Sequence, residues 1–61
     1  MMNETKEILA KMNELGISLM SDYEQVFEIA KSYTDGMDDL DASWFVSDIL
    51  NEINEYEMEN E

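Results

Sequence analysis

Two glycines divide this chain into three segments, and each segment repeats apolar residues with the period of an α-helix. Gly16 and Gly36 follow the first and second segments, where glycine is the favoured left-handed helix cap. Proline is absent, so nothing interrupts a helix within a segment. Three helices with short connections predict an all-α fold, a small three-helix bundle in which residues 1–61 form one domain.

The first two segments predict helices over about residues 4–15 and 21–34. Asn3 stands where the first helix needs an N-cap residue. Ser21 and Glu24 have the spacing of a capping box, in which each side chain bonds to the other residue's backbone amide. The first helix is short and its apolar face is narrow, so it needs packing partners to persist.

The stretch between these two helices fits two structures. In one, residues 16–20 form a loop that turns its apolar side chains into the core, namely Ile17, Leu19 and Met20. In the other, the second helix begins early, at Ser18. The sequence does not decide between them.

The third segment predicts the longest helix, over about residues 38–57. Asp38, Asp39 and Asp41 stand in its first turn, where the helix dipole favours negative charge. Apolar residues follow at alternating spacings of four and three and form a heptad seam: Ala42, Val46, Ile49, Ile53 and Tyr56.

This heptad seam has two alternative uses. In a monomeric bundle, which we favour, it packs against the other two helices, and Phe45 and Leu50 widen it. In a homodimer it pairs with the same helix of a second copy. The seam is shorter than the three or four heptads of a secure coiled coil, and its acidic flanks would repel in a parallel pair. Residues 57–61 either fray or complete the surface of this helix.

The charge of the chain limits its partners. Its formal net charge is −13, from 16 acids and three lysines. Residues 1–34 hold six acids and all three lysines, whereas residues 35–61 hold ten acids and no lysine. Such a charge argues against direct binding to nucleic acid or to an anionic membrane and favours basic surfaces. No apolar run approaches the roughly 20 residues of a membrane span, and no signal peptide is evident, so we expect a cytoplasmic protein.

The sequence predicts a protein that is not an enzyme and that holds no cofactor or metal. Histidine and cysteine are absent, which removes the commonest general base and the thiolate nucleophile. The aspartates before the third helix suggest a calcium loop. Aligning Gly36 with the EF-hand glycine, however, puts Lys31 and Tyr33 at ligand positions. Helix capping is therefore the expected role of these aspartates.

Acidic residues of the third helix fall on one line, which we call the acidic stripe. At about 100° per residue, its members lie within about 40° of one line along the helix: Asp41, Asp48, Glu52, Glu55 and Glu59. No lysine is interleaved, so the stripe lacks the ion pairs that stabilise a merely solvated helix face. Trp44 falls beside it, either as an exposed binding residue or as a core residue covered by another helix.

These features favour a small acidic binding protein that inhibits or regulates a partner by occupying its basic, nucleic-acid-binding surface. The expected partner-binding residues are the acidic stripe, Asp38 and Trp44. By analogy of size and charge, phage-encoded nucleic-acid mimics inhibit host defence or DNA-processing proteins in this way, in the host cytoplasm. The alternative is a helical interaction or dimerisation module, antitoxin-like or a small regulator, that acts through the heptad seam.

Overall fold

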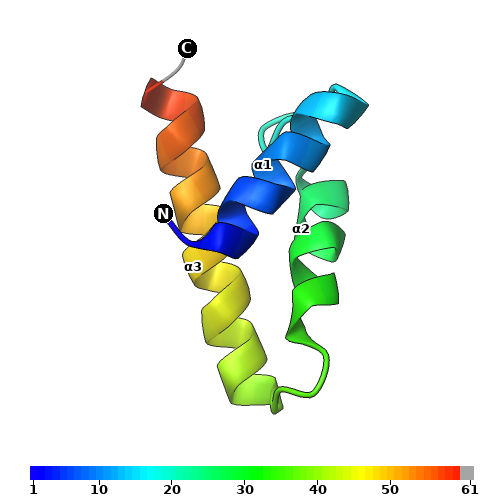
Figure 1. The fold of residues 1–61 in the computed structure, drawn as a ribbon, viewed down its shortest axis with the longest axis vertical. Helices are drawn as coiled ribbons and strands as arrows, with labels where there is room; N and C mark the ends of the chain where they lie inside the picture. Colours follow the sequence, from blue (N-terminus) through cyan, green and yellow to red (C-terminus); the bar gives the residue numbers. More distant parts are fainter. Residues whose placement is uncertain (60–61) are drawn as a thin grey trace.

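The computed structural model describes residues 1–59, which form three α-helices and no strand. Helix α1 spans Asn3–Leu15, and α2 spans Tyr23–Lys31 before tightening into a 3₁₀ turn, η1, at Ser32–Thr34. The longest helix, α3, spans Asp39–Glu59. The predicted all-helical fold is confirmed. In Figure 1, α1 crosses in front of α2 and α3, which are joined at the opposite end from the C-terminus.

The end of α1 follows the prediction and its beginning does not. Gly16 adopts a left-handed φ of 70°, and the Ile17 amide donates to the Met12 carbonyl at 3.0 Å. This is the glycine cap that the sequence predicts. The predicted N-cap is wrong, because Asn3 lies inside the helix and Met2 occupies the cap position without a side-chain bond. The first turn is held instead by a contact from α3, described below.

Residues 16–22 form a loop, so the helix does not begin early. Leu19 is buried in the core and Ile17 is half-buried. The expectation that Met20 also turns inward is wrong, because 90% of its surface is exposed. The loop thus contributes one side chain to the core and leaves a methionine in water.

The predicted capping box at the start of α2 is also wrong. The helix begins at Tyr23, and the cap position belongs to Asp22, which makes no side-chain cap bond. The Ser21 hydroxyl donates to Asp22 Oδ2 at 2.8 Å, and the Ser21 amide donates to Ser18 Oγ at 3.2 Å. These bonds within the loop compete with a helix cap and delay the start of the helix.

A tight turn connects η1 to α3. The Met37 amide donates to the Thr34 carbonyl at 3.0 Å, and Gly36 has a φ of 85°. A type II turn requires positive φ at this third position, which explains the glycine. Asp38 then caps α3, because its Oδ1 accepts a hydrogen bond from the Asp41 amide at 2.8 Å. The capping role predicted for these aspartates is confirmed at Asp38.

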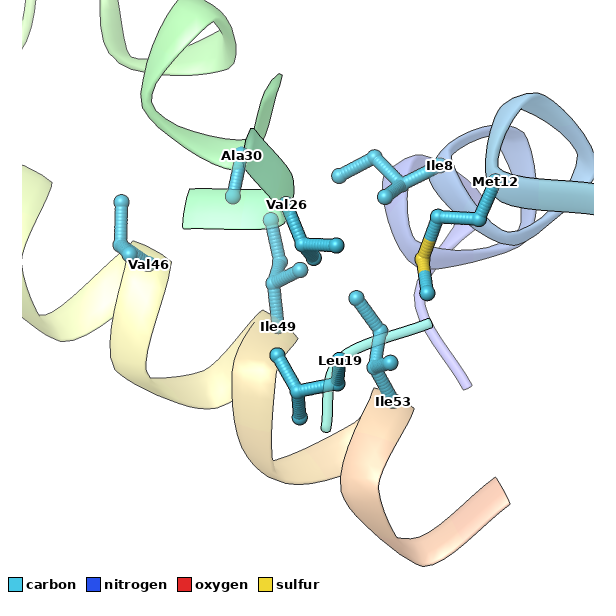
Figure 2. Close-up of a cluster of buried hydrophobic side chains, with 8 residues drawn as sticks. All are labelled: Ile8, Met12, Leu19, Val26, Ala30, Val46, Ile49 and Ile53. Carbon is cyan, nitrogen blue, oxygen red and sulfur yellow. The ribbon is translucent and has the colours of Figure 1, made fainter. Parts of the chain in front are cut away.

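The core lies where the three helices meet. Its buried apolar side chains are Ile8, Met12, Leu19, Val26, Ala30, Val46, Ile49 and Ile53. Figure 2 shows the α1 side chains turned toward those of α2 and α3. Three members of the heptad seam, Val46, Ile49 and Ile53, are buried here, so the seam packs into the chain's own core. Tyr56, at the end of the seam, stays 43% exposed.

The far end of α3 extends two residues beyond the predicted boundary and includes Glu57 and Glu59. Of the tail predicted at residues 57–61, the first three residues are therefore helical, and the last two lie outside the described residues. No helix within residues 1–59 is long and apolar enough to cross a membrane.

Alanine substitutions of two aliphatic residues in α3 test which face of the helix packs inward. Ile49 is fully buried, whereas Leu40 is 67% exposed. Ile49→Ala should lower the free energy of unfolding by about 2–5 kcal/mol, because it leaves a cavity. Leu40→Ala should change it by no more than about 0.5 kcal/mol. Urea denaturation followed by circular dichroism measures both, and equal losses would contradict this orientation of α3.

Candidate partner-binding surface

The surface of α3 outside the core carries two different kinds of side chain. One side holds exposed carboxylates of the acidic stripe: Asp41, Asp48, Glu55 and Glu59. Another side holds exposed uncharged polar groups: Ser43, Ser47, Asn51 and Asn54. The regular helix separates these two sets because each recurs at spacings of three, four or seven residues. Any partner therefore meets a different chemistry on each side of α3.

Glu52 differs from the rest of the predicted stripe, because its carboxylate is engaged inside the chain. Its Oε1 accepts one hydrogen bond from the Thr5 hydroxyl at 2.7 Å and another from the Met2 amide at 3.0 Å. Thr5 is fully buried, so this contact satisfies a hydroxyl that has no access to water. Glu52 thus holds the first turn of α1 against the middle of α3.

These two hydrogen bonds change how Glu52 titrates. The bond from the Thr5 hydroxyl lowers the pKa of the Glu52 carboxyl below its ordinary value, and the Met2 amide lowers it further. Both donors favour the charged form, because an ionised carboxylate is the stronger acceptor. At neutral pH, Glu52 is therefore the ionised acceptor of both hydrogen bonds that join α1 to α3.

Glu57 performs a similar task at the far end of α3. Its Oε2 accepts a hydrogen bond from the Leu19 amide at 2.9 Å. Leu19 is the loop residue that enters the core, so Glu57 fixes the point where residues 16–22 cross α3. From the sequence, Glu57 was expected either in a frayed tail or on the surface of the helix, so this contact was not predicted.

A third carboxylate links α1 to η1. The Tyr33 hydroxyl donates to Glu7 Oε1 at 3.4 Å. Burial raises the pKa of the Tyr33 phenol, and the nearby Glu7 carboxylate raises it further. This long bond is weaker than those of Glu52 and Glu57. It nevertheless adds a polar contact between α1 and the segment after α2.

Trp44 is exposed, so the alternative in which another helix covers it as a core residue is wrong. Neither α1 nor α2 covers it, and 65% of its surface remains accessible. Leu40, which precedes it by four residues in α3, is 67% exposed. Trp44 and Leu40 are one turn apart and form an apolar patch, here called the Trp44 patch, in the N-terminal part of α3. Large apolar side chains exposed together are typical of interaction sites.

The Trp44 patch borders the acidic stripe. Asp41 precedes Trp44 by three residues and Asp48 follows it by four, so both carboxylates flank the indole on the helix surface. Asp38, the remaining predicted site residue, is exposed and caps the same helix end. The structure therefore makes Asp41, Trp44 and Asp48 neighbours on one face of α3, with Asp38 at the N-terminal end of the same helix. Glu55 and Glu59 lie about two and about three turns beyond Asp48 on the same side.

Within residues 1–59, no group of three or more acidic side chains is placed to hold a metal ion. The aspartates near the start of α3 do not converge on a common point there. Comparison with protein-family models, with curated proteins and with solved structures found no match to this chain. Its function must therefore be argued from the surface itself.

The role of Thr5 can be tested by titration. The Glu52 carboxyl should titrate below its ordinary pKa of 4.5, and Thr5→Val should raise its midpoint toward that value. Folding lowers the pKa of Glu52, so its hydrogen bonds stabilise the folded chain fully at pH values above its ordinary pKa. This stabilisation is lost as the pH falls through the lowered pKa of the folded state. Carbon-detected NMR of the side-chain carboxyl measures both midpoints. A Glu52 midpoint at or above 4.5 in the wild-type chain would contradict the contact.

Proposed function

We propose that this chain is a small acidic binding protein that inhibits or regulates a partner by covering the partner's basic, nucleic-acid-binding surface. The observation that carries this proposal is the exposed Trp44, flanked on one helix by Asp41 and Asp48. A tryptophan is the side chain most enriched in binding hot spots, and carboxylates around it select a cationic partner. A face that is only solvated would gain nothing from an exposed indole.

The proposed contact has a simple chemistry. An arginine or lysine of the partner stacks on the Trp44 indole and pairs with one of the flanking aspartates. Leu40 excludes water from one side of this contact, which strengthens the electrostatic attraction. Glu55 and Glu59 extend the negative surface to the far end of α3.

The length of the stripe supports a nucleic-acid-binding surface as the target. At a rise of 1.5 Å per residue, Asp41 and Asp48 are roughly 10 Å apart along α3, and Asp48 and Glu55 are separated by the same distance. A row of carboxylates on this scale faces several basic residues at once, as a nucleic-acid backbone does. The net charge of −13 also speeds the encounter by steering. We place this encounter in the cytoplasm.

The alternative function, docking through the heptad seam, has a structural obstacle. Ile49 and Ile53 are fully buried, so a partner reaches them only if α1 or α2 moves away. The acidic stripe and the Trp44 patch are accessible without any such change. The exposed surface is therefore the better-supported site.

Affinity capture tests the proposal. The tagged chain should retain a partner from cell lysate at low salt and release it at high salt or on addition of duplex DNA, because nucleic acid competes for the same surface. Neutralising three exposed acids in one variant, Asp48→Asn with Glu55→Gln and Glu59→Gln, should abolish capture. Trp44→Ala should weaken binding about 30-fold or more, the usual effect of truncating a hot spot.

The matched control neutralises three exposed acids elsewhere, Glu14→Gln with Glu24→Gln and Glu28→Gln, and reaches the same net charge. It should bind nearly as well as the wild-type chain. Circular dichroism verifies that each variant is folded. Capture that persists at high salt, or that is weakened equally by both triple variants, would refute a site on the acidic stripe.

A further inference from the structure

A groove runs between α2 and α3, with the 16–22 loop at one end. No residue of α1 lines it, so it lies on the side of the α2–α3 pair that α1 leaves uncovered (Figure 1). Its volume, about 1150 Å³, exceeds the roughly 300–1,000 Å³ typical of small-molecule pockets. The groove is thus larger than a typical small-molecule site.

Apolar side chains make up much of the groove: Leu19, Met20, Tyr23, Phe27, Val46, Leu50, Tyr56 and Met58. The Tyr23 and Phe27 rings stack with centroids 6.3 Å apart. Met20, Tyr23 and Met58 are 90%, 55% and 65% exposed, so a large apolar surface stays in contact with water. Covering it would give a favourable hydrophobic contribution.

The groove is nearly uncharged, in contrast to the rest of this acidic chain. Its charged residues are Lys31 and Asp39 at one end and Glu57 at the other. Between these ends, the α3 side presents only uncharged groups, including Ser43, Ser47, Asn51 and Asn54. Glu57 already accepts the hydrogen bond from the Leu19 amide. A basic partner would find few carboxylates here and would meet Lys31.

We propose that a second copy of this chain docks in the groove, so that two grooves face each other across a two-fold axis. Two chains that each carry −13 repel strongly, and the groove is a surface whose lining contains only two carboxylates, Asp39 and Glu57. A two-fold axis near the middle of the groove places the Lys31 end of one copy against the Glu57 end of the other. Lys31 of each copy then lies near Glu57 of the other, with Asp39 at the same end, so the apolar contact along the groove makes the main contribution to association.

This dimer differs from pairing through the heptad seam, because Ile49 and Ile53 stay in the core of each copy. No residue of the acidic stripe lines the groove, although Asn51 borders Asp48 and Glu55 on the helix surface, so docking in the groove leaves the stripe outside the contact. The dimer would therefore present two stripes to basic partners. Added salt should strengthen this dimer, because screening weakens the repulsion between the two copies. The same salt should weaken binding to a basic partner.

Sedimentation equilibrium of the full chain tests this arrangement. The wild-type chain should form a dimer as its concentration rises, and added salt should lower the dissociation constant. Asn51→Glu places two new carboxylates near the two-fold axis and should weaken the dimer at least about tenfold at low salt. Asn13→Glu makes the same chemical change on the exposed side of α1 and should alter the dissociation constant less than about twofold.

Ser47→Glu supplies a second variant on the same side of α3, and circular dichroism verifies that each variant is folded. A chain that remains monomeric at millimolar concentration and high salt would overturn the proposal. Equal weakening by Asn51→Glu and Asn13→Glu would also overturn it. Neither measurement involves a basic partner, so its outcome is separate from that of the proposed function.

Discussion

The burial of one side of α3 is the constraint on which the rest of the molecule depends. Helices of 13 and nine residues, the lengths of α1 and α2, are marginal in water unless they pack against something. Val46, Ile49 and Ile53 of α3 provide that surface. Once they face the core, the positions of the acidic stripe and of the Trp44 patch follow from helical geometry.

The second constraint is charge. A chain of 61 residues with a net charge of −13 has a small core and strong internal repulsion. Two carboxylates of α3 serve to hold the bundle together, Glu52 by binding the first turn of α1 and Glu57 by binding the 16–22 loop. Exposed stripe residues such as Asp48 and Glu55 make no such contact and leave their charge for a partner.

Local periodicity was sufficient to predict the three helices, the Gly16 cap and the core residues of the seam, because each of these depends on residues within a few turns of one helix. The bundle follows because the apolar faces of these helices must be buried. Asn3, Ser21 and Met20 were placed wrongly because contacts from distant segments or bonds within a loop decided their positions. The internal role of Glu52 had a signal in the sequence, since it follows Ile49 by three residues and so adjoins the core. The groove depends on which side of α2 and α3 is covered by α1, and no local pattern encodes that choice.

The central claim is that the acids of α3 divide into structural and exposed groups. The most direct test is the free energy of unfolding, measured by urea denaturation at low salt for single carboxylate-to-amide variants. Glu52→Gln and Glu57→Gln should destabilise the chain, because the amide is a poorer acceptor than the carboxylate. Asp48→Asn and Glu55→Gln should leave stability unchanged or raise it by relieving repulsion. Similar losses in all four variants, or the reverse order, would contradict this division.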